Sequence, residues 1–198
     1  GSDRQEGLFE LPTDTLTAWL GRALEHDHAG SWAAFYGDAQ ALARDLAETY
    51  GIPWGHCADL IAALSPLKPW SENVRMAELA CKLWRAEQGL ATLPTLRNHK
   101  LAATKALMGE GPGGGLKVNA FAANIRGDLQ QVTMDRYIRR AAGYPSEHRI
   151  TKTLYAEITA QVQASAAVFG IEPATAQALI WGQVRADLGH DTYERIAA

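Results

Sequence analysis

Three features of this sequence have the residue types and the spacing that chemistry on an anionic substrate requires. A glycine-rich segment, Gly-Pro-Gly-Gly-Gly, occupies residues 111–115, Lys117 follows it, and Asp135 lies eighteen residues beyond the lysine. Glycine lets the backbone turn tightly and approach a ligand closely. A lysine binds phosphate or, when uncharged, attacks an electrophilic carbon, whereas a carboxylate activates water or stabilises a developing cation. These residues are therefore the first candidates for binding and catalysis.

The glycine-rich segment is expected to join two helices, the first ending near Met108 and the second beginning near Leu116. The first amides of a helix have no intrahelical acceptor, and they carry the positive end of the helix dipole. With Gly113, Gly114 and Gly115 directly before such a start, the segment predicts an anion site that suits a DNA phosphate. The alternative is a flexible loop without a ligand.

The charge of the chain is unevenly distributed along the sequence. Residues 94–152 contain ten Lys and Arg against four Asp and Glu, whereas the rest of the chain has nine basic and eighteen acidic residues. A basic block in an acidic protein is typical of a polyanion contact. Chance asymmetry on a solvated surface is the alternative.

The elements that must position these residues are helices. Apolar residues recur at helical spacing in almost every segment and none alternates like a strand, which predicts an all-α protein. Ser31 is expected to cap a helix that Gly51 and Pro53 end. Thr133 is expected to cap a later helix that reaches Ala142 and that Gly143 and Pro145 end. No apolar run is long enough to cross a bilayer, so no membrane contact is expected.

In order and spacing these segments resemble the helix-hairpin-helix DNA glycosylase superfamily, most closely its endonuclease III branch. The family hairpin Leu-Pro-Gly-Val-Gly-Arg-Lys is similar to residues 111–117, and the family's Val-Asp-Thr-His segment is similar to residues 133–137. Upstream, an apolar Leu-Ile-Ala-x-Leu-Leu-Ser helix and an Ala- and Leu-rich helix resemble residues 60–65 and 76–84. The resemblance covers about residues 56–144.

The resemblance implies two helical lobes with a cleft between them. Residues 54–128 would form a central lobe with the hairpin at 109–117, and residues 3–53 and 129–198 would form the terminal lobe. Asp135 would be the catalytic carboxylate, and Lys117 matches the amine nucleophile of the bifunctional members. The residues implied in DNA binding are Gly113, Gly114, Gly115, Lys117, Arg136 and Arg139. The alternatives are that Asp135 only caps its helix and that Lys117 only contacts a phosphate.

The sequence departs from the family in three places, of which one is the family's Thr-His after the aspartate, where Arg136 and Tyr137 stand here. The iron–sulfur cluster of the family needs four closely spaced C-terminal cysteines, but none follows Gly143, so neither a cofactor nor a metal is expected. Cys57 and Cys81 are expected to be buried thiols. Residues 65–73 lack the glutamine that endonuclease III relatives insert into the duplex, and their pattern is similar to small phage-encoded members. Trp70 and Asn73 are then candidates for a base pocket, with a place in the core as the alternative.

The function implied is that of a base-acting DNA enzyme of the glycosylase type, which flips a base out of DNA and uses Asp135 near the glycosidic bond. Some phage-type relatives are linked to thymine hypermodification, so one alternative is a transferase that exchanges a group on a modified thymine and retains the base. A non-catalytic DNA-binding module is the other alternative. The expected partner is DNA, and the protein is expected to act as a monomer in the cytoplasm, that of a bacterial host if it is phage-encoded.

Overall fold

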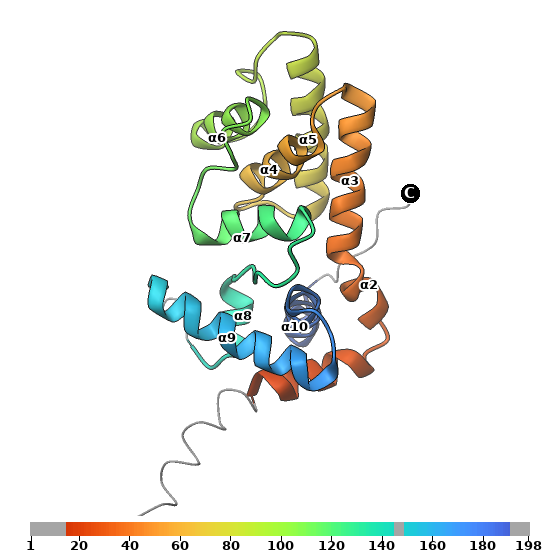
Figure 1. Cartoon of the computed structure of the whole chain (residues 1–198), viewed down its shortest axis with the longest axis vertical. Helices are drawn as coiled ribbons and strands as arrows, with labels where there is room; N and C mark the ends of the chain where they lie inside the picture. Colours follow the sequence, from red (N-terminus) through yellow and green to blue (C-terminus); the bar gives the residue numbers. More distant parts are fainter. Residues whose placement is uncertain (1–14, 145–148, 191–198) are drawn as a thin grey trace, which may run out of the picture. The chain divides into compact units, whose positions relative to one another are not determined.

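The computed structural model describes residues 15–144 and 149–190 (Figure 1). These residues form helices and their connections, with no strand among them, so the all-α prediction is confirmed. They divide into two compact units. Unit 1 combines the described residues up to 36 with those from 129 onward, and unit 2 is residues 37–128. Pro145, the expected end of a helix, lies outside the described residues.

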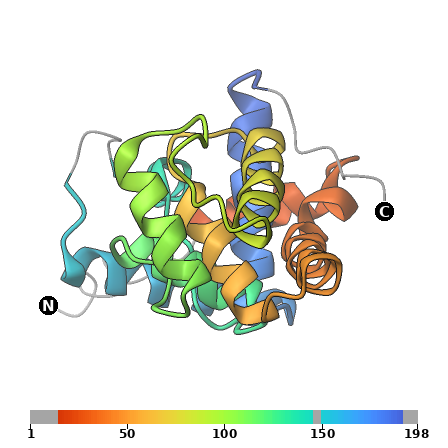
Figure 2. The same ribbon diagram turned by 90° about the horizontal axis from the view of Figure 1, so that it is seen from above.

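Unit 2 is built around one buried apolar helix. Its helices are α3 (Phe35–Tyr50), which begins two residues before the unit does, α4 (Trp54–Leu64), α5 (Trp70–Arg85), α6 (Arg97–Leu107) and α7 (Leu116–Ile125). Every residue of α4 from Cys57 to Leu64 is buried, and α4 packs against α5, α6 and α7 (Figures 1 and 2). Burial on all sides explains why α4 has a near-continuous apolar sequence rather than an apolar stripe.

An ion pair joins α4 to the end of α7. The Arg126 guanidinium donates to both carboxylate oxygens of Asp59, at 2.6 and 3.1 Å, and to the Gly55 carbonyl at 2.9 Å. The Asp59 side chain is only 5% exposed, so the carboxylate depends on this partner. The hydrogen bonds to Asp59 raise the pKa of Arg126 above its ordinary value. The C-terminal end of α7 is thereby fixed, whereas the ion pair leaves its N-terminal end unconstrained.

Unit 1 is also built around one helix. It contains a helix over residues 15–25, followed by α2 (Ala29–Ala33), α8 (Arg136–Ala141), α9 (Lys152–Phe169) and α10 (Pro173–Asp187). Helix α10 packs against α2, α8 and α9. Gly182 allows the close approach of α2, because a Cβ there would lie 2.2 Å from the Trp32 ring. Trp32 is consequently fully buried.

Two helix starts differ from the prediction. Ser31 lies inside the short α2, and the helix that follows begins at Phe35. Thr133 is buried before α8, and Asp135 is the residue that caps that helix. The reason is a tertiary contact: the Tyr155 hydroxyl donates to the Val132 carbonyl at 2.5 Å and accepts from the Met134 amide at 3.3 Å. These bonds occupy the backbone on both sides of Thr133, so the helix starts later.

The first boundary between the units lies at 36/37, whereas residues 3–53 were expected in one segment of the terminal lobe. Most of α3 belongs to unit 2 because its side chains contact that unit. Gln40 donates to the Ile125 carbonyl at 3.3 Å, and the Arg44 guanidinium lies 4.3 Å from the centre of the Trp54 ring. The second boundary between the units lies at 128/129.

Two further expectations concern the interior and the membrane. Cys57 and Cys81 are free thiols with no exposed surface, so the prediction that they are buried is confirmed. Their pKa values diverge because the two thiols share a hydrogen bond, which lowers that of Cys57 and raises that of Cys81. Among the described residues, no helix combines the length and the apolar character that crossing a membrane requires.

Candidate functional site

The glycine-rich segment forms an exposed loop between α6 and α7 in unit 2. Gly113 and Gly114 have φ angles of 64° and 67°, in the left-handed region that favours glycine. A Cβ on Gly114 would also lie 3.0 Å from the Val118 side chain. Gly115 has a φ of −95°, and a Cβ there would meet open space. The loop therefore requires glycine at 113 and 114, but its conformation does not require glycine at 115.

Asn119 holds this loop in place. Its side-chain amide donates to the carbonyls of Gly113, Gly114 and Gly115, at 3.3, 3.4 and 2.9 Å. Gly115 is the N-cap residue of α7, so no side chain accepts from the first amides of this helix, and no acidic residue lies in its first turn. The loop carbonyls thus face Asn119, while the start of α7 keeps its unpaired amides. Sequence reasoning missed Asn119, although its position four residues after Gly115 is a usable signal.

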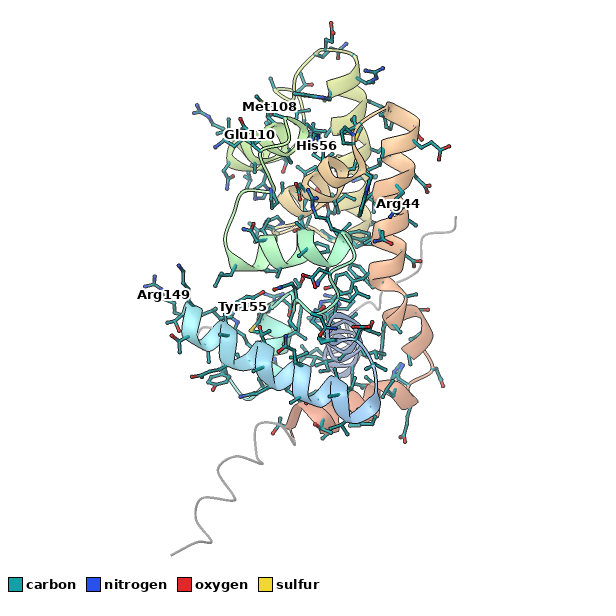
Figure 3. All side chains as sticks on the ribbon, viewed as in Figure 1. Arg44, His56, Met108, Glu110, Arg149 and Tyr155 are labelled. Carbon is teal, nitrogen blue, oxygen red and sulfur yellow. The ribbon has the colours of Figure 1, made fainter. Side chains whose placement is uncertain are left out.

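One basic residue lies beside the loop on its exposed side. Lys117 lies exposed on the first turn of α7. On the inner side, His56 of α4 lies against the beginning of the loop (Figure 3). A Cβ on Gly109 would come within 2.9 Å of the His56 Nε2 atom. The loop is therefore anchored to the central helix of unit 2 and open toward solvent, as a site for an external anion must be.

Asp135 has a structural role at the start of α8 in unit 1. Its Oδ1 atom accepts hydrogen bonds from the amides of Tyr137 and Ile138, at 2.9 and 3.0 Å. The side chain is half-buried. Because one oxygen bridges two amides, the carboxylate has a fixed position, which a catalytic carboxylate needs as much as a cap does.

Two phenols, the buried Tyr36 and the half-buried Tyr155, lie within electrostatic range of Asp135. Burial raises the pKa of Tyr36 above its ordinary value, a hydrogen bond with Thr133 opposes the rise, and the charge of Asp135 adds to it. Burial likewise raises the pKa of Tyr155 to about 12, with the Met134 amide opposing and Asp135 reinforcing the rise (Figure 3). The Tyr36 hydroxyl also donates to Gln177 of α10. Both phenols therefore remain protonated near Asp135 at neutral pH.

Basic side chains gather around the Tyr137 hydroxyl in the same unit. Arg136 and Arg185 donate to it at 3.1 and 3.4 Å, and the His190 Nδ1 atom lies 3.2 Å away. The hydrogen bond to Tyr137 raises the pKa of Arg136. Arg139 follows on α8 and is half-buried. The structure thus brings Arg185 and His190, which sequence reasoning missed, to the predicted arginine Arg136.

The base-pocket candidates Trp70 and Asn73 lie on the first turn of α5 in unit 2. The half-buried Trp70 ring has its centroid 6.4 Å from that of Phe121 on α7. Asn73 is 2% exposed, and its Oδ1 atom has no hydrogen-bond partner among the described residues. A buried acceptor without a donor costs free energy unless water or a ligand supplies one. Both residues are thus more buried than a surface contact would be, and Asn73 retains an unused acceptor.

The connection before Trp70 carries an unusual leucine. Leu67 is 90% exposed and has a φ of 63°, which is uncommon for a residue with a side chain. Water does not favour an exposed leucine, and the left-handed backbone is strained there. Sequence reasoning singled out this connection only for its missing glutamine and did not select Leu67.

The predicted site residues fall into two groups. The loop glycines, Lys117, Trp70 and Asn73 belong to unit 2, whereas Asp135, Arg136 and Arg139 belong to unit 1. In the described parts of both units, the His, Cys, Asp and Glu side chains form no group of three suited to a metal ion.

Comparison with known proteins adds a family but no activity. No curated protein matches the chain, and no solved structure matches it. A family match covers residues 11–187, which is most of the sequence. The chain therefore belongs to the family described as "Family of unknown function (DUF7178)".

Proposed function

We propose that this protein acts on a base in DNA, as an enzyme of the helix-hairpin-helix glycosylase type. The observation that carries the proposal is the loop between α6 and α7. It combines left-handed glycines, a helix start without a side-chain cap, and an exposed Lys117. Such a loop suits a phosphate, because unpaired amides and the helix dipole both favour negative charge.

The proposed chemistry uses Asp135. Cleavage of an N-glycosidic bond develops positive charge on the sugar, which a fixed carboxylate stabilises, or the carboxylate activates the attacking water. The two amides that hold Oδ1 set the position of the carboxylate before substrate arrives. The proposal requires that the loop of unit 2 and Asp135 of unit 1 reach the same DNA molecule.

Lys117 is proposed to contact phosphate rather than to act as the nucleophile. Its side chain is exposed on the first turn of α7. A nucleophilic lysine needs desolvation or a cationic neighbour to lose its proton, whereas an exposed ammonium suits a phosphate contact.

Leu67 is proposed as the residue that fills the space left by a flipped base. Extrusion of a base from the duplex costs stacking free energy, and apolar wedges such as leucine inserted between base steps offset part of that cost. An exposed leucine on a strained backbone has no evident role in the fold, which favours a role in contact with a ligand.

A second candidate function is a DNA-binding module without catalysis. The observation that favours it is the N-cap role of Asp135. A carboxylate that accepts hydrogen bonds from two backbone amides already has a structural function and needs no other. Asp135 is then a structural residue, and only the loop and the basic side chains contact DNA.

The experiment is incubation with duplex and single-stranded DNA of varied base content, including DNA with modified thymines, followed by mass spectrometry of nucleosides and free bases. Release of a free base supports the glycosylase proposal, and an altered base that stays attached supports the group-exchange transferase. Binding without any product supports the module.

The DNA assignment itself is tested by salt dependence. If about four phosphates are neutralised, the logarithm of the affinity falls with the logarithm of the salt concentration at a slope of roughly −3 to −4. An affinity that does not change with salt concentration, or the absence of binding, contradicts the assignment.

A further inference from the structure

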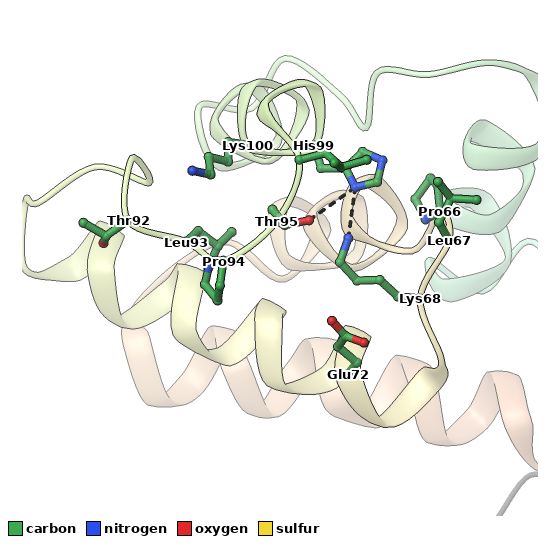
Figure 4. A pocket seen from close by; sticks show the side chains of 11 residues that line it. Pro66, Leu67, Lys68, Glu72, Thr92, Leu93, Pro94, Thr95, His99 and Lys100 are labelled. Atoms are coloured by element: carbon green, nitrogen blue, oxygen red, sulfur yellow. Dashed lines mark hydrogen bonds between the residues drawn. The ribbon is translucent and has the colours of Figure 1, made fainter.

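An open pocket of about 550 Å³ lies in unit 2 at the start of α6 (Figure 4). Its walls come from residues 66–68 and 92–96, with Glu72 of α5 and His99 and Lys100 of α6. The volume is within the range of small-molecule sites. Leu67, proposed above to fill the space of a flipped base, is one of its lining residues, but none of the residues proposed for phosphate binding or catalysis lines it.

A lysine and a histidine face each other inside the pocket. The Lys68 Nζ atom lies 3.0 Å from the His99 Nδ1 atom, and the Thr95 hydroxyl lies 3.3 Å from the same nitrogen (Figure 4). His99 is only 6% exposed, and Lys68 is half-buried. Because an ammonium or amine and a hydroxyl both approach Nδ1, the imidazole is neutral, with Nδ1 as its acceptor.

Burial of the pair favours the uncharged form of the amine. Burial lowers the pKa of Lys68, and the nearby Glu72 carboxylate only partly opposes this. Burial also lowers the pKa of His99, and the charge of Lys68 lowers it further. The other charged group of the pocket, Lys100, is held by a 2.7 Å hydrogen bond to the Ala91 carbonyl. The remaining lysines of the chain, Lys82, Lys105, Lys117 and Lys152, are exposed.

We propose that Lys68 is a reactive amine that forms an imine with a small aldehyde carrying an anionic group. His99 accepts a hydrogen bond from the amine and so orients its lone pair toward the pocket. The amine nitrogen forms a bond to the aldehyde carbon, and the proton that the nitrogen loses passes to the carbonyl oxygen. The carbinolamine then loses water, so that amine and aldehyde give imine and water.

The anionic group is assigned from the other side of the pocket. Lys100 supplies a positive charge there, and Leu96 in the pocket wall is the N-cap residue of α6, whose first amides no side chain caps. A carboxylate or phosphate on the aldehyde meets both features, while its carbonyl carbon meets Lys68. This aldehyde chemistry does not depend on the DNA function proposed above.

The experiment treats the protein, without DNA, with glyoxylate and cyanoborohydride at pH 7 and maps carboxymethyl groups on its lysines by peptide mass spectrometry. We expect Lys68 to be labelled several-fold faster than Lys105, an exposed lysine of α6, because the lowered pKa of Lys68 raises its uncharged fraction and the His99 contact orients its amine. Labelling of Lys68 no faster than that of Lys105 overturns the proposal.

Two further arms sharpen the result. The Lys68→Arg variant retains the positive charge and must lose the fast labelling, whereas Lys105→Arg, the matched control, must keep it. Propanal, which has no anionic group, must label Lys68 several-fold more slowly than glyoxylate relative to Lys105. Equal relative rates overturn the anionic substrate class. Because the wild-type peptide map needs no variant, misfolding of Lys68→Arg does not remove the test.

Discussion

The starts of α7 and α8 differ in what satisfies their first backbone amides. Both helices begin with amides that have no intrahelical acceptor. Helix α8 satisfies two of them with its own Asp135 carboxylate, whereas α7 begins at Gly115 and has no side-chain cap. A helix start that already holds a carboxylate has little use for an external anion, while an uncapped start beside an exposed lysine retains that preference.

The comparison assigns different tasks to the two units. In unit 2, the loop is held from behind by Asn119 and His56 and remains open in front. In unit 1, Asp135 is held by two amides and lies near protonated phenols. The first arrangement suits binding and the second suits a fixed catalytic group, so substitutions at the two helix starts should affect different measurements.

The largest expected effect is at Asp135. Asp135→Asn keeps an oxygen that can accept from the amides of Tyr137 and Ile138 but removes the negative charge. We expect a folded protein that binds DNA normally and releases base at least about a hundredfold more slowly, as for the loss of a principal acid–base group. Single-turnover base release and DNA affinity measure the two effects.

The control is Asp135→Ala, which removes cap and charge together. It should show the same loss of activity and in addition a loss of about 1 kcal/mol in stability, the usual cost of an N-cap. An Asp135→Asn variant with unchanged turnover would mean that Asp135 is only a cap, and the difference between the two helix starts would then have no catalytic meaning.

The next effect is at the glycines before α7. Gly114→Ala places a side chain at a φ of 67° with its Cβ 3.0 Å from Val118, so the loop must move. Strain of about 1–3 kcal/mol is expected for such a residue. If the loop positions a phosphate as proposed, DNA affinity should fall about tenfold or more, because the strain distorts the bound geometry. Filter binding or fluorescence anisotropy at fixed salt measures the affinity.

Gly115→Ala is the matched control for this substitution. Its φ of −95° suits any residue, and its Cβ meets open space, so the loop should be unchanged. If Gly115→Ala weakens DNA binding as much as Gly114→Ala does without loss of stability, the phosphate approaches the backbone at Gly115 directly. If neither variant alters binding, the loop does not contact DNA.

The sequence predicted what depends on local preference and missed what depends on tertiary contacts. Helical periodicity, the buried cysteines and the glycine loop were all visible in local patterns. Local patterns did not show that Asp135 rather than Thr133 caps α8. That difference depends on the Tyr155 hydroxyl, twenty or more residues away along the chain. The same holds for Arg185 and His190, which folding alone brings to Tyr137.

Spacing also failed to show which glycines need to be glycine. The sequence offers Gly113, Gly114 and Gly115 alike for the turn, whereas the left-handed residues nearest to α7 are Gly113 and Gly114. In a run of three glycines every φ is accessible, so the sequence does not decide which residues use that freedom. The three hydrogen bonds from Asn119 decide it in the folded chain.

The smallest expected effect concerns the segment that leads into α8. Tyr155 bonds to the backbone on both sides of Thr133, so Tyr155→Phe should lower the stability of unit 1 by about 0.5–1.5 kcal/mol near pH 8. Burial raises the pKa of Tyr155 to about 12 in the folded chain, whereas it ionises near 10 when unfolded. The folded state therefore binds the proton more tightly, and the contribution of the phenol is complete below pH 10 and is lost between pH 10 and about 12.

Urea unfolding of the wild type and of Tyr155→Phe from pH 8 to 12 tests this linkage. The difference in unfolding free energy between the two should narrow as the pH rises through this window. Because the charge of Asp135 contributes to the high pKa of Tyr155, Asp135→Asn should move the narrowing to lower pH. A difference in unfolding free energy that stays constant to pH 12 would show that folding does not raise the pKa of Tyr155. The start of α8 would then be held by Asp135 alone, without support from α9.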